Sequence, residues 1–208
     1  MKMTLASFST FIKFLKESFD DSFLLREIPQ VKSQVQSLKF ILRHDVQKHL
    51  NQALALAQKE QELGLRGSFL IDINSPELGE SPDEVKRTLQ QINALGHEVG
   101  LLLPSIRHLS PQTTVEKFYE QQVLNLARHL EKIVTAPVFS VAFPEESFVY
   151  PENSYFLAQK TCASSALLTR WVLSDRREGI HLEALQEELN SPPDKILQVI
   201  FHPELWRV

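Results

Sequence analysis

The hydrophobic positions of the chain form short apolar runs, and the segments between them have helical spacing. The runs predict six strands, at Leu38–Leu42, Gly67–Ile73, Glu98–Leu103, Val138–Phe143, Ala166–Leu173 and Ile196–Phe201. Between them, apolar residues recur every three or four positions, which predicts amphipathic helices. Alternating strands and helices favour an α/β fold with a mainly parallel sheet covered by helices, in which a seventh strand can be hidden.

Several predicted helices carry signals at their ends. Ser81 and Pro82 precede two acidic residues, a pattern typical of a helix N-terminus. Gly64 and Gly96 follow helical segments, where glycine commonly ends a helix. A further helix is expected from about Pro151. The first segment is also helical in pattern, and it either packs on the body of the protein or binds a partner. Its apolar residues are Phe8, Phe11, Ile12, Leu15 and Phe19.

The composition favours one ordinary globular domain. The 208 residues are 43% hydrophobic and 23% charged, so we expect one domain over 1–208, with 1–36 as an N-terminal helical extension packed on it. The net charge of -4 comes without a basic cluster, which argues against a nucleic-acid partner. Cys162 is the only cysteine, and neither a signal-peptide pattern nor a membrane-spanning apolar run is present. These features predict a cytoplasmic protein, and a protein partner or homo-oligomer stays open.

Polar side chains gather where the predicted strands end. In parallel α/β folds, functional groups lie just beyond the carboxyl ends of the strands, because the loops there converge on one face. The residues at these ends are Arg43, His44, Asp45, Gln47, Asp72, Leu102, Ile106, Glu145, Asp175, Arg176 and His202. For Asp72, Glu145 and Asp175 individually, a solvated acid is the commoner outcome. The pattern therefore predicts a pocket at this edge without naming its chemistry.

Four short motifs in these regions occur together in one known family. They are Leu42–Val46 (LRHDV), Gly96–Leu101 (GHEVGL), Ser174–Arg176 (SDR) and Val199–Trp206 (VIFHPELW). With these motifs in order over residues 38–206, the chain resembles the polysaccharide deacetylase (NodB-like) superfamily, carbohydrate esterase family four. The resemblance implies a distorted, incomplete (β/α) barrel with about six or seven mainly parallel strands. It also implies hydrolysis of acetyl groups on sugars, with a divalent metal such as zinc polarising the carbonyl.

The same resemblance implies that the metal ligands are missing. The family uses one aspartate as general base, an aspartate two residues later as a ligand, and two histidines four residues apart as further ligands. Asp45 matches the base, but Gln47 stands at the second aspartate, and Leu102 and Ile106 stand at the histidines. A neutral amide binds a divalent ion poorly, and an aliphatic side chain has no lone pair to donate. We therefore expect no metal and no other cofactor.

Three functional hypotheses follow. The favoured one is a deacetylase-like protein without metal-dependent activity, acting as a binding or regulatory module for a carbohydrate or sugar-related molecule. The second is a hydrolase with Asp45 as general base and His202 or His44 as its partner. Without its metal, such an enzyme should lose orders of magnitude in rate. The third is a structural subunit that binds a protein partner through its N-terminal helix.

The hypotheses make one shared structural prediction. In a nearly closed barrel the first and last strands are neighbours. We therefore expect His44, Asp45 and His202 to lie together at the carboxyl edge of the sheet. The residues expected to line the pocket around them are Arg43, Gln47, Asp72, Leu102, Ile106, Glu145, Asp175 and Arg176.

Overall fold

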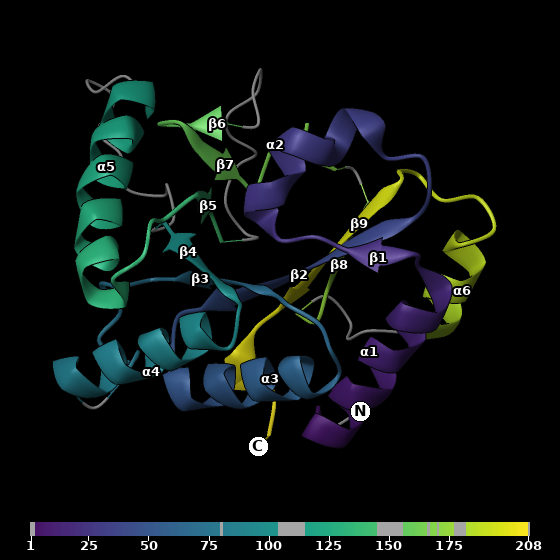
Figure 1. Ribbon diagram of the computed structural model, residues 1–208, viewed down its shortest axis with the longest axis horizontal. Coiled ribbons are helices and arrows are strands. Elements are labelled where there is room, and N and C mark those ends of the chain that lie inside the picture. The colour runs from purple at the N-terminus through teal and green to yellow at the C-terminus, as the bar shows by residue number, and fades with distance from the viewer. Residues whose placement is uncertain are drawn as a thin grey trace.

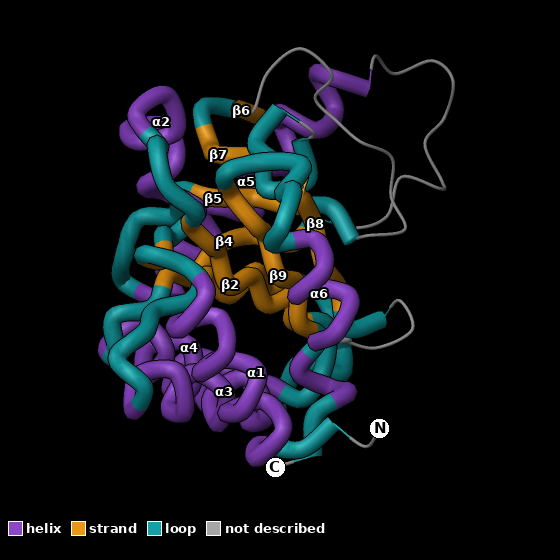
Figure 2. The backbone as a smooth tube through the Cα atoms, turned by 90° about the vertical axis from the view of Figure 1, so that its right-hand side faces the viewer, coloured by secondary structure: helices purple, strands orange, loops and turns teal. Residues whose placement is uncertain are grey.

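The protein is described by a computed structural model that covers most of the chain. The described residues are 3–79, 81–103, 115–144, 156–165, 167–169, 171–176 and 182–207, and for 115–119 the backbone alone. They form a curled, mostly parallel sheet with helices packed against it (Figure 1). Figure 2 shows the strands in the middle, with α1, α3 and α4 on one side and α2 on the other. The predicted fold class, a mainly parallel incomplete (β/α) barrel, is confirmed.

The described sheet has the strand order β6-β7-β5-β4-β3-β2-β9-β8, and β1 pairs with β2 outside this path. The strands are β1 (Asp21–Ser22), β2 (Lys39–Val46), β3 (Ser68–Ile71), β4 (Glu98–Leu102), β5 (Ser140–Ala142), β6 (Phe156–Leu157), β7 (Lys160–Cys162), β8 (Trp171–Ser174) and β9 (Ile196–Phe201). Among them, only the pairing of β6 with β7 is antiparallel. The predicted contact between the first long strand and the last is confirmed, because β2 and β9 are neighbours.

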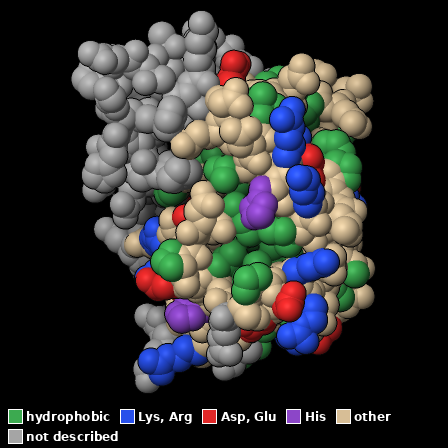
Figure 3. Space-filling view, turned by 90° about the vertical axis from the view of Figure 1, so that its left-hand side faces the viewer, with side chains coloured by type: hydrophobic (Ala, Val, Ile, Leu, Met, Phe, Trp, Pro, Cys, Tyr) green, Lys and Arg blue, Asp and Glu red, His purple; other side chains and the backbone are tan. Residues whose placement is uncertain are grey.

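Helices cover both faces of this sheet. They are α1 (Leu5–Ser18), α2 (Ile28–Val31), α3 (Leu50–Glu62), α4 (Pro82–Ala94), α5 (Val115–Val134) and α6 (Leu182–Glu188), with short 3-10 turns η1 (Leu25–Glu27), η2 (Lys32–Gln34) and η4 (Pro203–Leu205). On the side of the molecule where α4 and α5 lie, hydrophobic side chains gather centrally and Lys and Arg side chains lie towards the margins (Figure 3). In the described part of the chain, no helix has the length and apolar character needed to cross a membrane.

The helix ends follow from local sequence chemistry. The Ser81 side chain accepts a hydrogen bond from the Glu84 N–H at 3.2 Å, and Pro82 stands at the first helical position of α4. Gly64 and Gly96 follow α3 and α4 with φ values of 71° and 92°, a left-handed conformation that glycine adopts without strain. These three predicted helix boundaries are confirmed.

Side chains alternate between two faces of the sheet, and each face has its own core. The inner face carries Ile41, Arg43 and Asp45 of β2, and its apolar residues pack on Leu25 and Ile28 of the N-terminal segment. The outer face packs on α3, α4 and α5 at one end and on α1 and α6 at the other. The apolar residues of α1 are buried in this outer core: Phe8, Phe11, Ile12 and Leu15. The helix therefore directs its apolar face into its own chain.

The region after β5 differs from the sequence prediction. A helix was expected from about Pro151, but the described part of that region, from Phe156 to Cys162, is the hairpin of β6 and β7. Two parallel strands were not predicted from the apolar pattern: β7, which pairs with β5, and β1, which pairs with β2. The strand expected over Ala166–Leu173 is shorter, because β8 begins only at Trp171.

Candidate functional site

Asp45 and His202 lie at equivalent positions on neighbouring strands. In the ladder between β2 and β9, Arg43 pairs with Ile200 and His44 pairs with Phe201. Asp45 directly follows His44, and His202 directly follows Phe201. Side-chain alternation directs both to the inner face. Both are buried, with 1% of each exposed. The fold thus brings two of the three predicted catalytic residues together at the carboxyl edge.

Asp45 is fixed by a buried ion pair with Arg43. Arg43 Nε donates to Asp45 Oδ1 at 2.6 Å, and Nη2 donates to Oδ2 at 2.7 Å. Nη2 also donates to the carbonyl oxygen of Phe143, which follows β5, at 2.8 Å. Because both carboxylate oxygens accept from one guanidinium, Asp45 is held as a paired carboxylate.

His202 is oriented by Asp175, which follows β8. The Asp175 Oδ1 atom lies 2.5 Å from His202 Nδ1, and Oδ2 accepts from the His202 backbone N–H at 2.9 Å. Trp206 Nε1 donates to the same Oδ2 at 2.7 Å. The Trp206 ring packs on Phe8 and Phe201, so it belongs to the core. A carboxylate that holds the Nδ1 side of an imidazole fixes its tautomer and its orientation.

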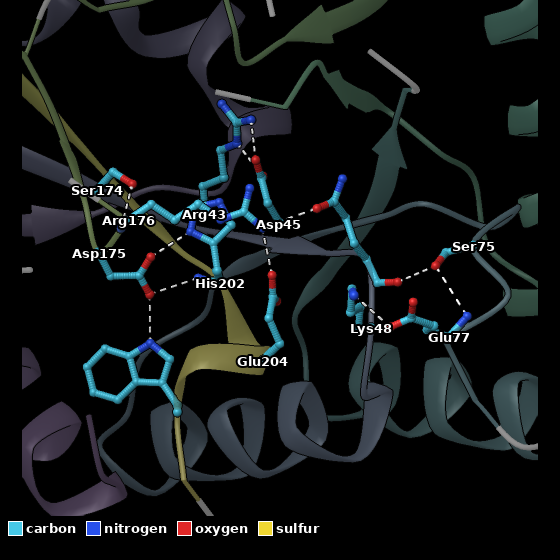
Figure 4. Close-up of polar contacts among 12 residues, drawn as sticks. Arg43, Asp45, Lys48, Ser75, Glu77, Ser174, Asp175, Arg176, His202 and Glu204 are labelled. Atoms are coloured by element: carbon cyan, nitrogen blue, oxygen red, sulfur yellow. Dashed lines mark hydrogen bonds and ion pairs between the residues drawn. The ribbon is translucent and has the colours of Figure 1, made fainter. Parts of the chain in front are cut away.

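Arg176 connects the ends of β8 and β2. Its Nη2 donates to Gln47 Oε1 at 3.2 Å and to Glu204 Oε1, in η4, at 2.7 Å. Figure 4 shows Arg176 among Asp45, His202 and Glu204. The position expected for a ligand aspartate is thus an amide that accepts from a guanidinium.

Leu102 and Asp72 complete the described part of this edge. Leu102 is 1% exposed and packs in the apolar cluster of the inner face. Burial raises the pKa of Asp72, although a hydrogen bond from the Asn74 N–H opposes the rise. Ile106 and Glu145, the other two expected pocket residues, lie outside the described residues. Beside this edge is a pocket of about 300 Å³, lined by His49, Asn51, Glu77, Leu78, Gly79 and Glu84.

The prediction that His44 joins the catalytic group is wrong. Strand β2 continues through Val46, so His44 points to the outer face while Asp45 points inward. The His44 ring stacks on Phe69, with centroids 4.1 Å apart, and its Nε2 lies 2.6 Å from Glu60 Oε1 on α3. His44 and Glu60 are both completely buried. His44 therefore joins a sheet strand to a helix on the face away from Asp45.

His97 belongs to the same outer polar cluster as His44 and Glu60. Its protonation makes the stability of the fold depend on pH. Its Nδ1 accepts from the Gly67 N–H and its Nε2 donates to the Ala57 carbonyl, both at 2.9 Å, so the folded protein holds a neutral ring. Burial lowers the pKa of His97, although the nearby Glu60 charge opposes this.

Stability is therefore expected to fall on mild acidification. In the unfolded chain His97 takes up a proton near pH 6.5, while the folded protein resists it, so its contribution is full above that pH and declines below it. Urea unfolding between about pH 8 and pH 5.5 should show a loss of at most about 1.4 kcal/mol per pH unit from this group. His97→Gln should flatten the slope just below pH 6.5. A slope that is unchanged in this variant would exclude His97 as its source.

Sequence reasoning missed two acidic partners of these networks. Glu60 continues the buried face of α3 formed by Ala53 and Ala57, so an acid at helical spacing with apolar residues was the available signal. Glu204 was part of a quoted motif, but nothing in the sequence indicated its contact with Arg176.

A divalent metal, which this kind of fold implies, does not fit the described residues. Leu102 is buried among apolar side chains, the Gln47 amide accepts from Arg176, and both oxygens of Asp45 accept from Arg43. Among the described residues, His, Cys, Asp and Glu side chains nowhere form a group of three or more that could hold an ion.

Comparison with known proteins finds solved structures with a similar fold. The sequence matches no protein-family model and no curated protein. A CE4 family pseudoenzyme from Bacillus anthracis has a similar structure, with a TM-score of 0.55 and 15% identity over 82% of this chain and 56% of that chain. A mutant of the peptidoglycan deacetylase PdaC from Bacillus subtilis has a TM-score of 0.50 and 15% identity, over 82% of this chain and 77% of that chain. The deacetylase PplD from Streptococcus pyogenes, in complex with acetate, has a TM-score of 0.50 and 10% identity, over 98% and 85%.

These similarities confirm the resemblance at the level of the fold. The chain has the fold of the NodB-like polysaccharide deacetylase superfamily. It spans 56% of the length of the B. anthracis pseudoenzyme, so it corresponds to part of that protein.

Proposed function

We propose that this chain is a deacetylase-fold protein that carries out no metal-dependent deacetylation and binds a carbohydrate or sugar-related molecule as a binding or regulatory module. The observation that carries the proposal is the contact between Arg176 and Gln47 at 3.2 Å, because it puts an amide and a guanidinium where a ligand carboxylate is required. Buried Leu102 supports it. The proposal includes one domain over 1–208 in the cytoplasm.

Two further observations support this choice. The B. anthracis protein with a similar fold is itself a pseudoenzyme, and a mutant of it with restored enzymatic activity has a TM-score of 0.52 to this chain. The pocket beside the carboxyl edge is lined by His49, Asn51, Glu77 and Glu84, which offer the donors and acceptors that sugar hydroxyls require. As the pseudoenzyme shows, a protein can retain such a fold without the enzymatic activity.

The purified protein is expected to hold no stoichiometric zinc, cobalt or nickel and to release no acetate from chitin-type oligomers. Elemental analysis and an acetate assay measure both. Calorimetric titration with acetylated and deacetylated oligomers is expected to show binding, weakened by Asn51→Ala in the pocket and unchanged by Gln91→Ala at an exposed position of α4. One tightly held ion per chain, lost in Asp45→Asn, or metal-dependent turnover, would restore the enzyme hypothesis.

A metal-independent hydrolase is the second candidate, because Asp175 orients His202 as it would a general acid or base. Asp45 can serve as the base only through the lone pairs that Arg43 leaves, because each carboxylate oxygen accepts one hydrogen bond from the guanidinium. Acetate release that persists in a chelator and disappears in both Asp45→Asn and His202→Gln would favour it.

The third hypothesis, a structural subunit that binds through the N-terminal helix, has less support. The apolar side chains of α1 are buried in the core of the same chain, so that face is already covered.

A further inference from the structure

Arg176 spans the carboxyl edge from one strand end to another. It follows β8, and its Nη2 bridges Gln47 Oε1, just beyond β2, and Glu204 Oε1 in η4. In the strand order, β9 lies between β8 and β2, so the side chain crosses one strand (Figure 4). One guanidinium therefore joins three segments of the chain.

Gln47, Asp72 and Leu102 occupy matching positions on three adjacent strands. Strands β2, β3 and β4 pair through Val46, Ile71 and Leu101, and the three residues follow these directly. Neighbouring strands lie about 4.8 Å apart, so side chains at such positions can share one small ligand. Arg176 brings a positive charge to one end of this row.

We propose that Arg176 is the resident cation of this edge and that it opposes metal binding independently of the missing ligands. The inference rests on the proposed function and explains how the edge is stable without a metal. Asp45 already accepts from Arg43, Asp175 accepts from His202 and Trp206, and Glu204 accepts from Arg176. A divalent ion would have to displace these donors and lie near a guanidinium of the same charge sign.

A double-mutant cycle between Gln47→Asp and Arg176→Gln tests the contact itself. Gln47→Asp gives Arg176 a charged acceptor, and for a partly exposed pair the melting temperature is expected to rise by about 1–3 °C. In the Arg176→Gln background the same change is expected to give no rise. Equal shifts in both backgrounds overturn the proposal. The cycle changes no buried apolar residue, so it remains decisive if variants at Leu102 fail to fold.

Zinc titration then tests metal exclusion. The host is Gln47→Asp with Leu102→His, in which Asp72 lies between the two new ligands. Adding Arg176→Gln is expected to raise zinc affinity roughly tenfold or more, because it removes a repulsive charge and frees the carboxylate. Adding Arg66→Gln removes the same charge from an ion pair with Glu27 near the start of β3 and should change nothing. Equal affinity with and without Arg176, including no binding in both, overturns the proposal.

Failure of this inference differs from failure of the proposed function. If the unmodified chain holds a stoichiometric metal ion, the proposed function fails. If the unmodified chain holds none and Arg176 has no effect in the variants, only the inference fails.

Discussion

Replacing Arg43 with methionine is expected to lower the free energy of unfolding by about 3–5 kcal/mol. Arg43 is 2% exposed and donates to both oxygens of Asp45, at 2.6 and 2.7 Å. Without the guanidinium, Asp45 becomes a buried carboxylate that has lost its partner, and the Phe143 carbonyl loses a donor. Urea unfolding followed by circular dichroism measures the loss.

The combined variant Arg43→Met with Asp45→Leu distinguishes two quantities. One is the net contribution of the ion pair to stability, and the other is the cost of leaving one partner buried without the other. Removing both charges often restores stability, so the double variant should be clearly more stable than Arg43→Met alone. Arg66→Met is the matched control, because the Arg66 side chain is 49% exposed, and it should change stability by no more than about 0.5 kcal/mol. If Arg43→Met stays within that margin too, the buried pair does not stabilise the fold.

The same pair affects the functional interpretation. A general base needs a carboxylate oxygen within reach of the proton it removes. Both oxygens of Asp45 accept from Arg43, and Leu102, where the resemblance predicts a histidine ligand, is buried. These contacts agree with the proposed binding module, and the intact His202–Asp175 pair is the feature that the hydrolase hypothesis requires.

Long apolar runs made the central strands predictable. Ile196–Phe201 was expected and observed with the same bounds, because an uninterrupted buried run bounded by polar residues has few alternatives. The β6–β7 hairpin was missed for a physical reason. Its turn residues, Ala158 and Gln159, both have positive φ, a conformation that normally calls for Asn or Gly. Without those residue types, two strands of two and three residues leave almost no signal.

How much of the candidate site could be predicted depended on where the first long strand was expected to end. Asp45, His202, Asp175 and Arg176 do lie at the carboxyl edge. His44 was misplaced because the predicted first strand ended at Leu42, which left the following residues in a loop. Once β2 is extended to Val46, the two-residue period of a strand forces His44 and Asp45 to opposite faces. Contacts made by long side chains, such as Arg176 with Gln47, depend on tertiary packing that a local pattern does not encode.

Replacing Glu60 with leucine is the second change with a large expected effect, a loss of about 2–5 kcal/mol in the free energy of unfolding. Glu60 Oε1 lies 2.6 Å from His44 Nε2, and within the described part of the chain His44 Nδ1 has no hydrogen-bond partner. The variant therefore leaves a fully buried imidazole without any hydrogen bond. The cluster has little room to adjust, since a Cβ on Gly67 would lie only 2.5 Å from Glu60 Oε2. Thermal and urea unfolding measure the effect.

Glu62→Leu on the same helix is the matched control, because the Glu62 side chain is 58% exposed and its ion pair with Lys59 lies at the surface. This variant should stay within about 0.5 kcal/mol of the parent. Glu60→Gln should fall between the two, since its amide oxygen can still accept from His44 while the charge is lost. If Glu60→Leu is as stable as Glu62→Leu, the contact between β2 and α3 through His44 and Glu60 does not hold the helix to the sheet.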